Sequence, residues 1–298
     1  MSIFQGGCLA MVLLLASSLA GAATPSQQYQ QLRSQATLLA VNALIYYDAQ
    51  PDARPDKRHL SALQGAQQRL DALALQLNLP SRPLENVGEA AETRQKQART
   101  RSLRGVNEQS EPVFNAVSAT QVVFQQPASD IGDSLAGLNA WLAKLQELSR
   151  DEAPRYPQLL VGLLDSRAQL DRQAAAAYQQ VADELSPAMR LLNRQSLDIA
   201  SLLLHAQARS ARVIGDHSLA FAEAEFIARD QAIKQGFDEL SRLLPEQAEA
   251  LHKQRLAYRF VRKRLLDRDP GQVIGGLERY LAGVVVALDR LAAANPDE

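Results

Sequence analysis

The chain has 298 residues, and its 32 basic and 33 acidic side chains give a formal net charge of −1. This balance excludes the strongly basic surface that is typical of nucleic-acid-binding proteins, so we predict no nucleic-acid partner. Aromatic residues make up only 5% of the chain, whereas alanine, leucine, glutamine and arginine, which favour helices, are abundant.

Residues 1–22 are predicted to be a secretory signal peptide. An apolar run from Leu9 to Ala16 precedes Ala20-Gly21-Ala22, which matches the small-residue cleavage signal. The apolar stretch is shorter than the roughly 20 residues of a membrane-spanning helix, and retention as an uncleaved anchor is the alternative. Cleavage would remove Cys8, the only cysteine, and with it any disulfide or thiolate chemistry. We therefore expect a soluble protein of the bacterial periplasm.

The segments after the signal peptide show apolar residues at helical spacing almost throughout. Prolines separate most of these segments, as expected for helix boundaries, and the sequence shows no convincing strand-like alternation. These patterns predict an all-α fold, an elongated helical bundle. The apolar stripes run from Tyr29 to Tyr46, Leu63 to Leu77, Ile131 to Leu145, Met189 to Ala206, Ile233 to Leu244 and Ile274 to Leu291.

The two halves of the chain match each other in four places and in the same order. This order predicts two related four-helix units, residues 26–150 and 187–294, with a connecting helix in residues 151–186. The matched segments are 29–46 with 189–206, 70–73 with 237–240, 89–97 with 246–254, and 137–142 with 276–281.

One segment, "EQAEALHKQ" at 246–254, holds Glu249 and His252 at the spacing of a bundle metal half-site. Such a site needs a second pair and two further glutamates that face inward. In the repeat, His252 falls opposite Gln95, and the nearest second pair is Asp56 with His59. We therefore predict no metal, and no cofactor.

The motifs of secreted enzymes are missing from the sequence. It contains no nucleophile elbow, no zinc-protease motif and no phosphate-binding glycine loop. Of the four histidines, His205 is expected to be a core or boundary residue and His217 to lie in a turn. We predict that the protein is not an enzyme, although an enzyme with an unrecognised site remains a third hypothesis.

The most distinctive charged segment is "HKQRLAYRFVRKRLLDR" at 252–268. Arg255, Arg259 and Arg262 would lie on one face of a helix, with Lys263 beside them. This face is either solvated or a docking surface for an envelope protein, a small anion or an anionic surface, which includes peripheral membrane contact. These four residues are the candidate partner-binding residues.

The tandem units resemble the periplasmic sensing modules of type IV pilus chemotaxis transducers and nitrate sensors. The first helix of that family carries a run like R-Q-R-M-L-S-Q-R. Here, only Ser34-Gln35 and Arg194-Gln195 match parts of it, so no ligand-binding residue can be transferred. The resemblance implies a periplasmic relative of a sensor input domain without membrane-spanning or signalling parts.

Together these features predict an exported, non-enzymatic helical bundle that acts by binding, as an adaptor or interaction protein of the cell envelope. The alternative is a receptor for a small anion or amphiphile. A receptor should place polar residues inside the bundle, as Ser196 on its apolar stripe already suggests. An adaptor should instead expose an apolar patch.

Overall fold

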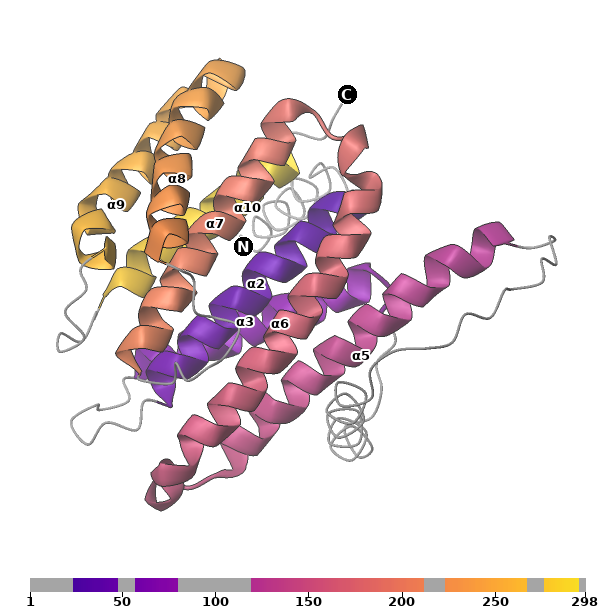
Figure 1. The fold of residues 1–298 in the computed structure, drawn as a ribbon, viewed down its shortest axis with the longest axis vertical. Helices are drawn as coiled ribbons and strands as arrows, with labels where there is room; N and C mark the ends of the chain where they lie inside the picture. The colour runs from indigo at the N-terminus through magenta and orange to yellow at the C-terminus, as the bar shows by residue number, and fades with distance from the viewer. Residues whose placement is uncertain (1–23, 48–56, 80–118, 212–222, 267–275, 295–298) are drawn as a thin grey trace, which may run out of the picture.

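The computed structural model describes residues 24–47, 57–79, 119–211, 223–266 and 276–294, and all regular structure within them is helical. The prediction of an all-α fold is therefore confirmed (Figure 1). The α-helices are α2 (Pro25–Tyr46), α3 (Lys57–Gln76), α5 (Ala119–Glu147), α6 (Tyr156–Val181), α7 (Pro187–Ser210), α8 (Glu223–Leu243), α9 (Ala248–Leu266) and α10 (Leu277–Ala294). Short 3₁₀ turns are η2 (Arg150–Arg155), η3 (Ala182–Glu184) and η4 (Pro245–Gln247).

The two central helices begin with the same combination of a hydroxyl residue and a proline. Thr24 precedes Pro25 in α2, and its N–H donates to the Gln27 Oε1 atom at 3.1 Å. Ser186 precedes Pro187 in α7, and its Oγ accepts the Met189 N–H at 3.3 Å. Proline suits the first helical position because the N–H that it lacks would have no partner within the helix there.

One proline departs from the expected pattern. Pro127 does not mark a helix boundary, because α5 begins at Ala119 and continues through this proline to Glu147. A proline inside a helix removes one backbone hydrogen bond. The apolar stripe that follows, from Ile131 to Leu145, is buried along its whole length and holds the helix against its neighbours.

The core forms where α2 and α7 meet the helices around them. α2 packs against α3, α6, α7 and α10, and α7 packs against α2, α8 and α10. The described residues of the six predicted stripes are buried or pack against the buried core. Because α2 is covered on several sides, many of its polar side chains are buried as well, among them Gln30, Ser34 and Gln35. Such positions on α2 contribute to the polar contacts described below.

The second half of the chain forms a closed ring of four helices. α7 packs against α8, α8 against α9, α9 against α10, and α10 back against α7. In the first half, α6 packs against both α2 and α5. The segment at 89–97, on which the predicted repeat depends, lies outside the described residues, as do residues 1–22, Asp56 and His217. The two-unit repeat therefore stays a prediction.

A glycine brings α5 and α6 close together. A Cβ atom on Gly162 of α6 would lie 2.6 Å from the indole ring of Trp141 on α5. Trp141 is partly buried and packs against the core. Within the described part of the chain, every helix is too short or too polar to cross a lipid bilayer.

Candidate functional site

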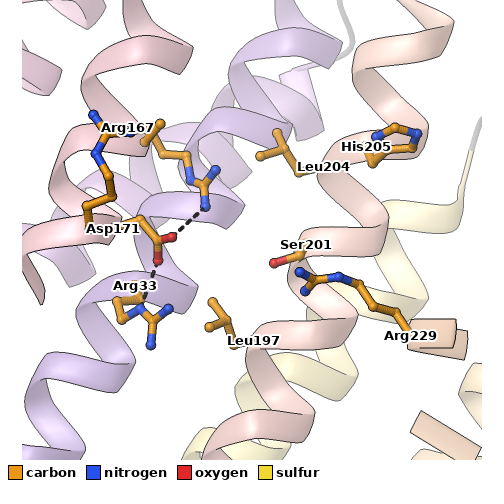
Figure 2. Close-up of a pocket in the computed structure, with 10 residues that line it drawn as sticks. Arg33, Arg167, Asp171, Leu197, Ser201, Leu204, His205 and Arg229 are labelled. Atoms are coloured by element: carbon orange, nitrogen blue, oxygen red, sulfur yellow. Dashed lines mark hydrogen bonds and ion pairs between the residues drawn. The ribbon is translucent and has the colours of Figure 1, made fainter. Parts of the chain in front are cut away.

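A cavity of about 280 Å³ lies among four helices, α2, α6, α7 and α8 (Figure 2). Its volume is equivalent to about nine water molecules in the liquid, so it can hold a small ligand. Four arginines line it together with a single carboxylate. The lining residues are Arg33, Arg167, Ala168, Asp171, Arg172, Leu197, Ser201, Leu204, His205 and Arg229.

Two of the arginines share that carboxylate. The Arg33 Nε atom lies 2.8 Å from Asp171 Oδ1, and an Arg167 guanidinium nitrogen lies 3.6 Å from Oδ2. Arg172 is exposed and donates to the side chain of Gln169, which places it where the cavity meets the surface. Three cations on this side of the cavity are thus balanced by one anion.

Arg229 enters from the opposite side, and Figure 2 shows its guanidinium beside Ser201. It pairs with Asp198 of α7 and with Glu225 of its own helix, both at 3.0 Å. Asp198 in turn also pairs with the exposed Arg194 at 3.6 Å. Burial raises the pKa of Asp198, and the charge of Arg229 partly opposes that rise.

Arg167 is the most unusual of the cavity residues because it is a buried cation. Only 7% of its surface is exposed, and its Nε atom has no hydrogen-bond acceptor among the described residues. Burial lowers the pKa of its guanidinium, Asp171 partly opposes that effect, and the charge of Arg33 lowers the pKa further. A buried charge with incomplete pairing destabilises a fold, so Arg167 is a group that a bound anion would satisfy.

The remaining wall of the cavity is partly apolar. Leu197 and Leu204 of α7 face the cavity together with Ser201, which lies between them in sequence, and His205 follows Leu204. His205 is buried, as the sequence predicted, and its ring lies 5.2 Å from that of Phe226. The cavity thus combines guanidinium donors with a small apolar surface, a mixture that suits an anion with an apolar body.

A second polar cluster lies where α2, α7 and α10 meet. Asp289 of α10 is buried, and its two carboxylate oxygens accept the hydroxyls of Ser34 at 2.7 Å and Ser196 at 2.5 Å. Gln35 adds an amide donor at 3.1 Å, and Arg69 of α3 donates to that glutamine at 2.7 Å. Burial raises the pKa of Asp289 to about 6, although these donors oppose the rise.

This cluster ties the three helices together. The hydroxyl donors come from α2 and α7, so the carboxylate of α10 bridges the two central helices. Gln27 extends the contact at the far end of α10, where its amide donates to the Ala292 carbonyl at 2.9 Å. Ser34, Ser196 and Gln35 all donate to the Asp289 carboxylate. The cluster therefore supports the packing of the helices, and it leaves less room for a ligand than the arginine cavity does.

The structure places the four predicted partner-binding residues on α9, away from the cavity. Arg262 forms two hydrogen bonds with the buried Asp230 of α8, and Arg255 pairs with Asp238 at 2.7 Å. Arg259 and Lys263 are exposed. Two of the four therefore hold α9 against α8, and the other two are available to a partner. Their role in binding stays a prediction.

The histidine half-site lies on the same helix. Glu249 and His252 are both exposed, and His59 of α3 lies 3.6 Å from Glu278 of α10. Among the described residues, no three histidine, cysteine or acidic side chains come together in a way that could hold a metal ion. The absence of a metal stays a prediction.

Sequence reasoning missed the arginine cavity because its residues come from distant parts of the chain. Arg33 and Arg229 are 196 residues apart in the sequence, and the pair Arg167 and Asp171 has a spacing found on many solvated helices. Arg33 does precede Ser34-Gln35, the pair quoted for the resemblance. That adjacency was the one local signal near the site.

No family model, curated protein or solved structure matches the chain.

Proposed function

We propose that this protein is a non-enzymatic periplasmic receptor that binds a small organic anion in the cavity between α2, α6, α7 and α8. The observation that carries the proposal is Arg167, a buried guanidinium with one distant carboxylate and one nitrogen that lacks an acceptor. A protein that needed only stability would gain from an apolar residue there. A ligand that brings a carboxylate would complete the pairing.

The distribution of polar residues supports a receptor over a pure adaptor. A receptor was expected to place polar groups inside the bundle, and the buried residues include Gln30, Gln35, Asn193 and Gln195 from the two central helices. Several of these satisfy backbone carbonyls, such as Gln195, which donates to the Ile233 carbonyl at 2.7 Å. The arginines that line the cavity differ from these buried amides because four guanidinium groups share the cavity wall with one carboxylate, Asp171.

The lining narrows the class of ligand. Arginine presents paired N–H donors that match the two oxygens of a carboxylate. Arg33 and Arg167 each make only a single contact with Asp171, at 2.8 Å and 3.6 Å, so each guanidinium has donors left for a ligand. Leu197 and Leu204 provide an apolar wall that a purely inorganic anion would leave unused. We therefore propose a monocarboxylate with a short aliphatic or aromatic body, bound between the α6 arginines and the α7 leucines.

Isothermal titration calorimetry tests the proposal directly. The purified protein would be titrated with acetate, hexanoate and benzoate, with the matching amides, and with inorganic phosphate. We expect binding of the longer carboxylates and not of the neutral amides. Binding of phosphate with an affinity equal to that of hexanoate would contradict the assigned apolar contact, and failure of all the anions to bind at millimolar concentration would contradict the proposal.

Variants locate the binding in the cavity. Arg167→Gln should weaken carboxylate binding by about 10- to 100-fold, because a hydrogen bond to a charged group contributes roughly 1.5–3 kcal/mol. Arg190→Gln is the matched control, since Arg190 is an exposed α7 arginine that pairs with the exposed Asp183 at 3.9 Å. Equal loss in both variants would place the ligand elsewhere.

The periplasmic location is part of the proposal and is supported by the sequence of residues 1–22. Mass spectrometry of the N-terminus should find a mature chain that begins near Ala23 in the soluble periplasmic fraction. A chain that retains Met1 and sediments with membranes would instead identify the apolar segment as an anchor.

A further inference from the structure

The outer face of α9 carries exposed apolar side chains. Phe260 is 71% exposed, and its ring contacts that of Tyr280 on α10, with 5.1 Å between the ring centroids. Leu256, one turn earlier on α9, is 48% exposed. These residues belong to two packed helices and form a small apolar ridge. Figure 1 shows α8 and α9 side by side at one edge of the structure.

Basic residues surround this ridge. Lys253, Lys263 and Arg264 are exposed, and at 3.6 residues per turn they lie within an arc of about 100° that also contains Phe260 and Leu256. The sequence from 253 to 266 contains no acidic residue. The two cations of this segment that pair with α8, Arg255 and Arg262, point to the other side of the helix.

Complementarity with the helix dipole explains only part of this pattern. Lys263 and Arg264 lie in the last turn of α9, where positive charge stabilises a helix. That effect does not account for Lys253, three turns earlier, nor for the exposure of Phe260 and Leu256. An exposed aromatic residue between basic residues is the arrangement of interfacial helices, whose apolar side chains enter the headgroup region of a bilayer.

We propose that the face formed by Lys253, Leu256, Phe260, Lys263, Arg264 and Tyr280 docks the protein on an anionic phospholipid surface. The three cations lie within twelve residues, a rise of about 16 Å along the helix axis, so they meet several headgroups and do not converge on one small anion. Phe260, Leu256 and Tyr280 lie between them and enter the interface. The residues that line the arginine cavity belong to other helices, so this docking surface is independent of the proposed receptor site.

Flotation with lipid vesicles tests the proposal. The purified full-length protein would be mixed with vesicles of phosphatidylethanolamine and phosphatidylglycerol, or with vesicles of phosphatidylcholine alone. We expect binding to the vesicles that contain phosphatidylglycerol, weakened by added salt because the screening length is only about 8 Å at physiological ionic strength. Equal binding to phosphatidylcholine, or no binding to either, would overturn the proposal.

Matched variants separate this face from the general charge of the protein. The triple change Lys253→Gln, Lys263→Gln and Arg264→Gln should weaken binding about 100-fold, because each basic residue near an anionic bilayer contributes roughly fivefold. The control triple change Arg155→Gln, Lys234→Gln and Arg242→Gln alters the net charge equally at exposed positions on other helices. An equal loss in the control would overturn the assignment of the face.

The aromatic contribution is tested separately. Phe260→Ser should weaken binding about tenfold, the effect of removing one inserted apolar side chain, and Phe260→Trp should preserve it. Leu75→Ser is the matched control, because Leu75 of α3 is 75% exposed and lies outside the face. Unchanged vesicle binding of Phe260→Ser would overturn the insertion. Retention of an acidic protein by the wild-type face, without vesicle binding, would replace the lipid with a protein partner.

Discussion

Two groups of arginines in this structure differ in how their charge is balanced. On α9, Arg255 and Arg262 each meet a separate carboxylate of α8, and one of these carboxylates, Asp230, is buried with the Tyr258 hydroxyl as a further donor. In the cavity, Arg33 and Arg167 share Asp171. The first arrangement joins two helices, whereas the second leaves positive charge in excess inside the bundle.

The comparison shows that the role of a charged residue depends on the groups packed around it. Whether the residue belongs to a conspicuous charged run in the sequence matters less. The α9 arginines lie close together along one helix, and two of them pair with carboxylates of α8. The cavity arginines come from three helices and destabilise one another, since the charges of Arg33 and Arg172 both lower the pKa of the Arg167 guanidinium after burial has lowered it. Under the proposed function, this excess charge lowers stability and is kept because a bound anion uses it.

Arg262→Ala should have the largest effect on stability. Asp230 is only 2% exposed, and loss of its cation would leave a buried carboxylate with the Tyr258 hydroxyl alone. We expect a loss of about 3 kcal/mol in the free energy of unfolding, at the lower end for a broken buried pair because Arg262 is partly exposed. Urea denaturation followed by circular dichroism measures it.

Arg255→Ala is the control for that measurement. Its partner Asp238 is 56% exposed, and exposed pairs contribute about 0–1 kcal/mol. Equal losses in the two variants would show that the two α9 arginines are not distinguished by burial. A small loss in both would remove the claim that Arg262 holds α9 to α8.

Asp289 should make stability depend on pH. Its ordinary pKa of 3.8 applies to the unfolded chain, and burial raises the folded value to about 6. Between these values the folded state binds the proton more tightly, so stability rises as the pH falls from about 6 to about 4 and is flat above pH 6. The difference corresponds to roughly 2–3 kcal/mol, since one pKa unit is worth about 1.4 kcal/mol.

The Asp289→Asn variant isolates this contribution. It keeps the size of the side chain and removes its charge, so the dependence between pH 4 and pH 6 should disappear. Identical pH profiles for wild type and variant would show that Asp289 does not titrate in this range.

Gly162→Ala should destabilise the protein by about 1–3 kcal/mol through overpacking, because the new methyl group would lie 2.6 Å from the ring of Trp141. The contrasting variant is Gly283→Ala on α10, where a Cβ meets nothing within 4 Å. There we expect a gain of roughly 0.5–1 kcal/mol from helix propensity. Thermal unfolding of the two variants should therefore move in opposite directions, and a shift in the same direction would contradict the close packing of α5 on α6.

His252→Ala should have the smallest effect, a change within about 0.5 kcal/mol, because the side chain is exposed. Elemental analysis of the purified protein should find less than one equivalent of zinc, iron or copper, and chelation should leave the melting temperature unchanged. Stoichiometric metal that is lost in the variant would show that Glu249 and His252 form a true half-site.

The sequence predicted the helices and their buried faces because that information is local. Apolar residues three and four apart must share one side of a helix, and stripes such as Leu63 to Leu73 are buried as the spacing required. Pro127 lies inside α5, so a proline beside an apolar stripe does not by itself fix the end of a helix. Ser196 is a polar residue on an apolar stripe, and its hydroxyl donates to the Asp289 carboxylate.

The cavity could not be predicted in the same way. Its residues meet only when α2, α6, α7 and α8 pack together, and each of its arginines is an ordinary helix residue when considered alone. On α9, by contrast, the basic residues form a run that is evident in the sequence, and that run predicted a single basic surface. The structure divides that run between α8 carboxylates and solvent, a division that depends on the partner helix.

The most direct test of the central claim is the stability of Arg167→Met without ligand. If the guanidinium is kept for a bound anion, its replacement by an apolar side chain of similar length should leave the free energy of unfolding unchanged or raise it by about 1 kcal/mol. Asp171 would retain Arg33 at 2.8 Å. The same variant should lose the increase in melting temperature that hexanoate gives the wild type. A loss of 2 kcal/mol or more, with the hexanoate effect intact, would contradict the account and make Arg167 a structural cation.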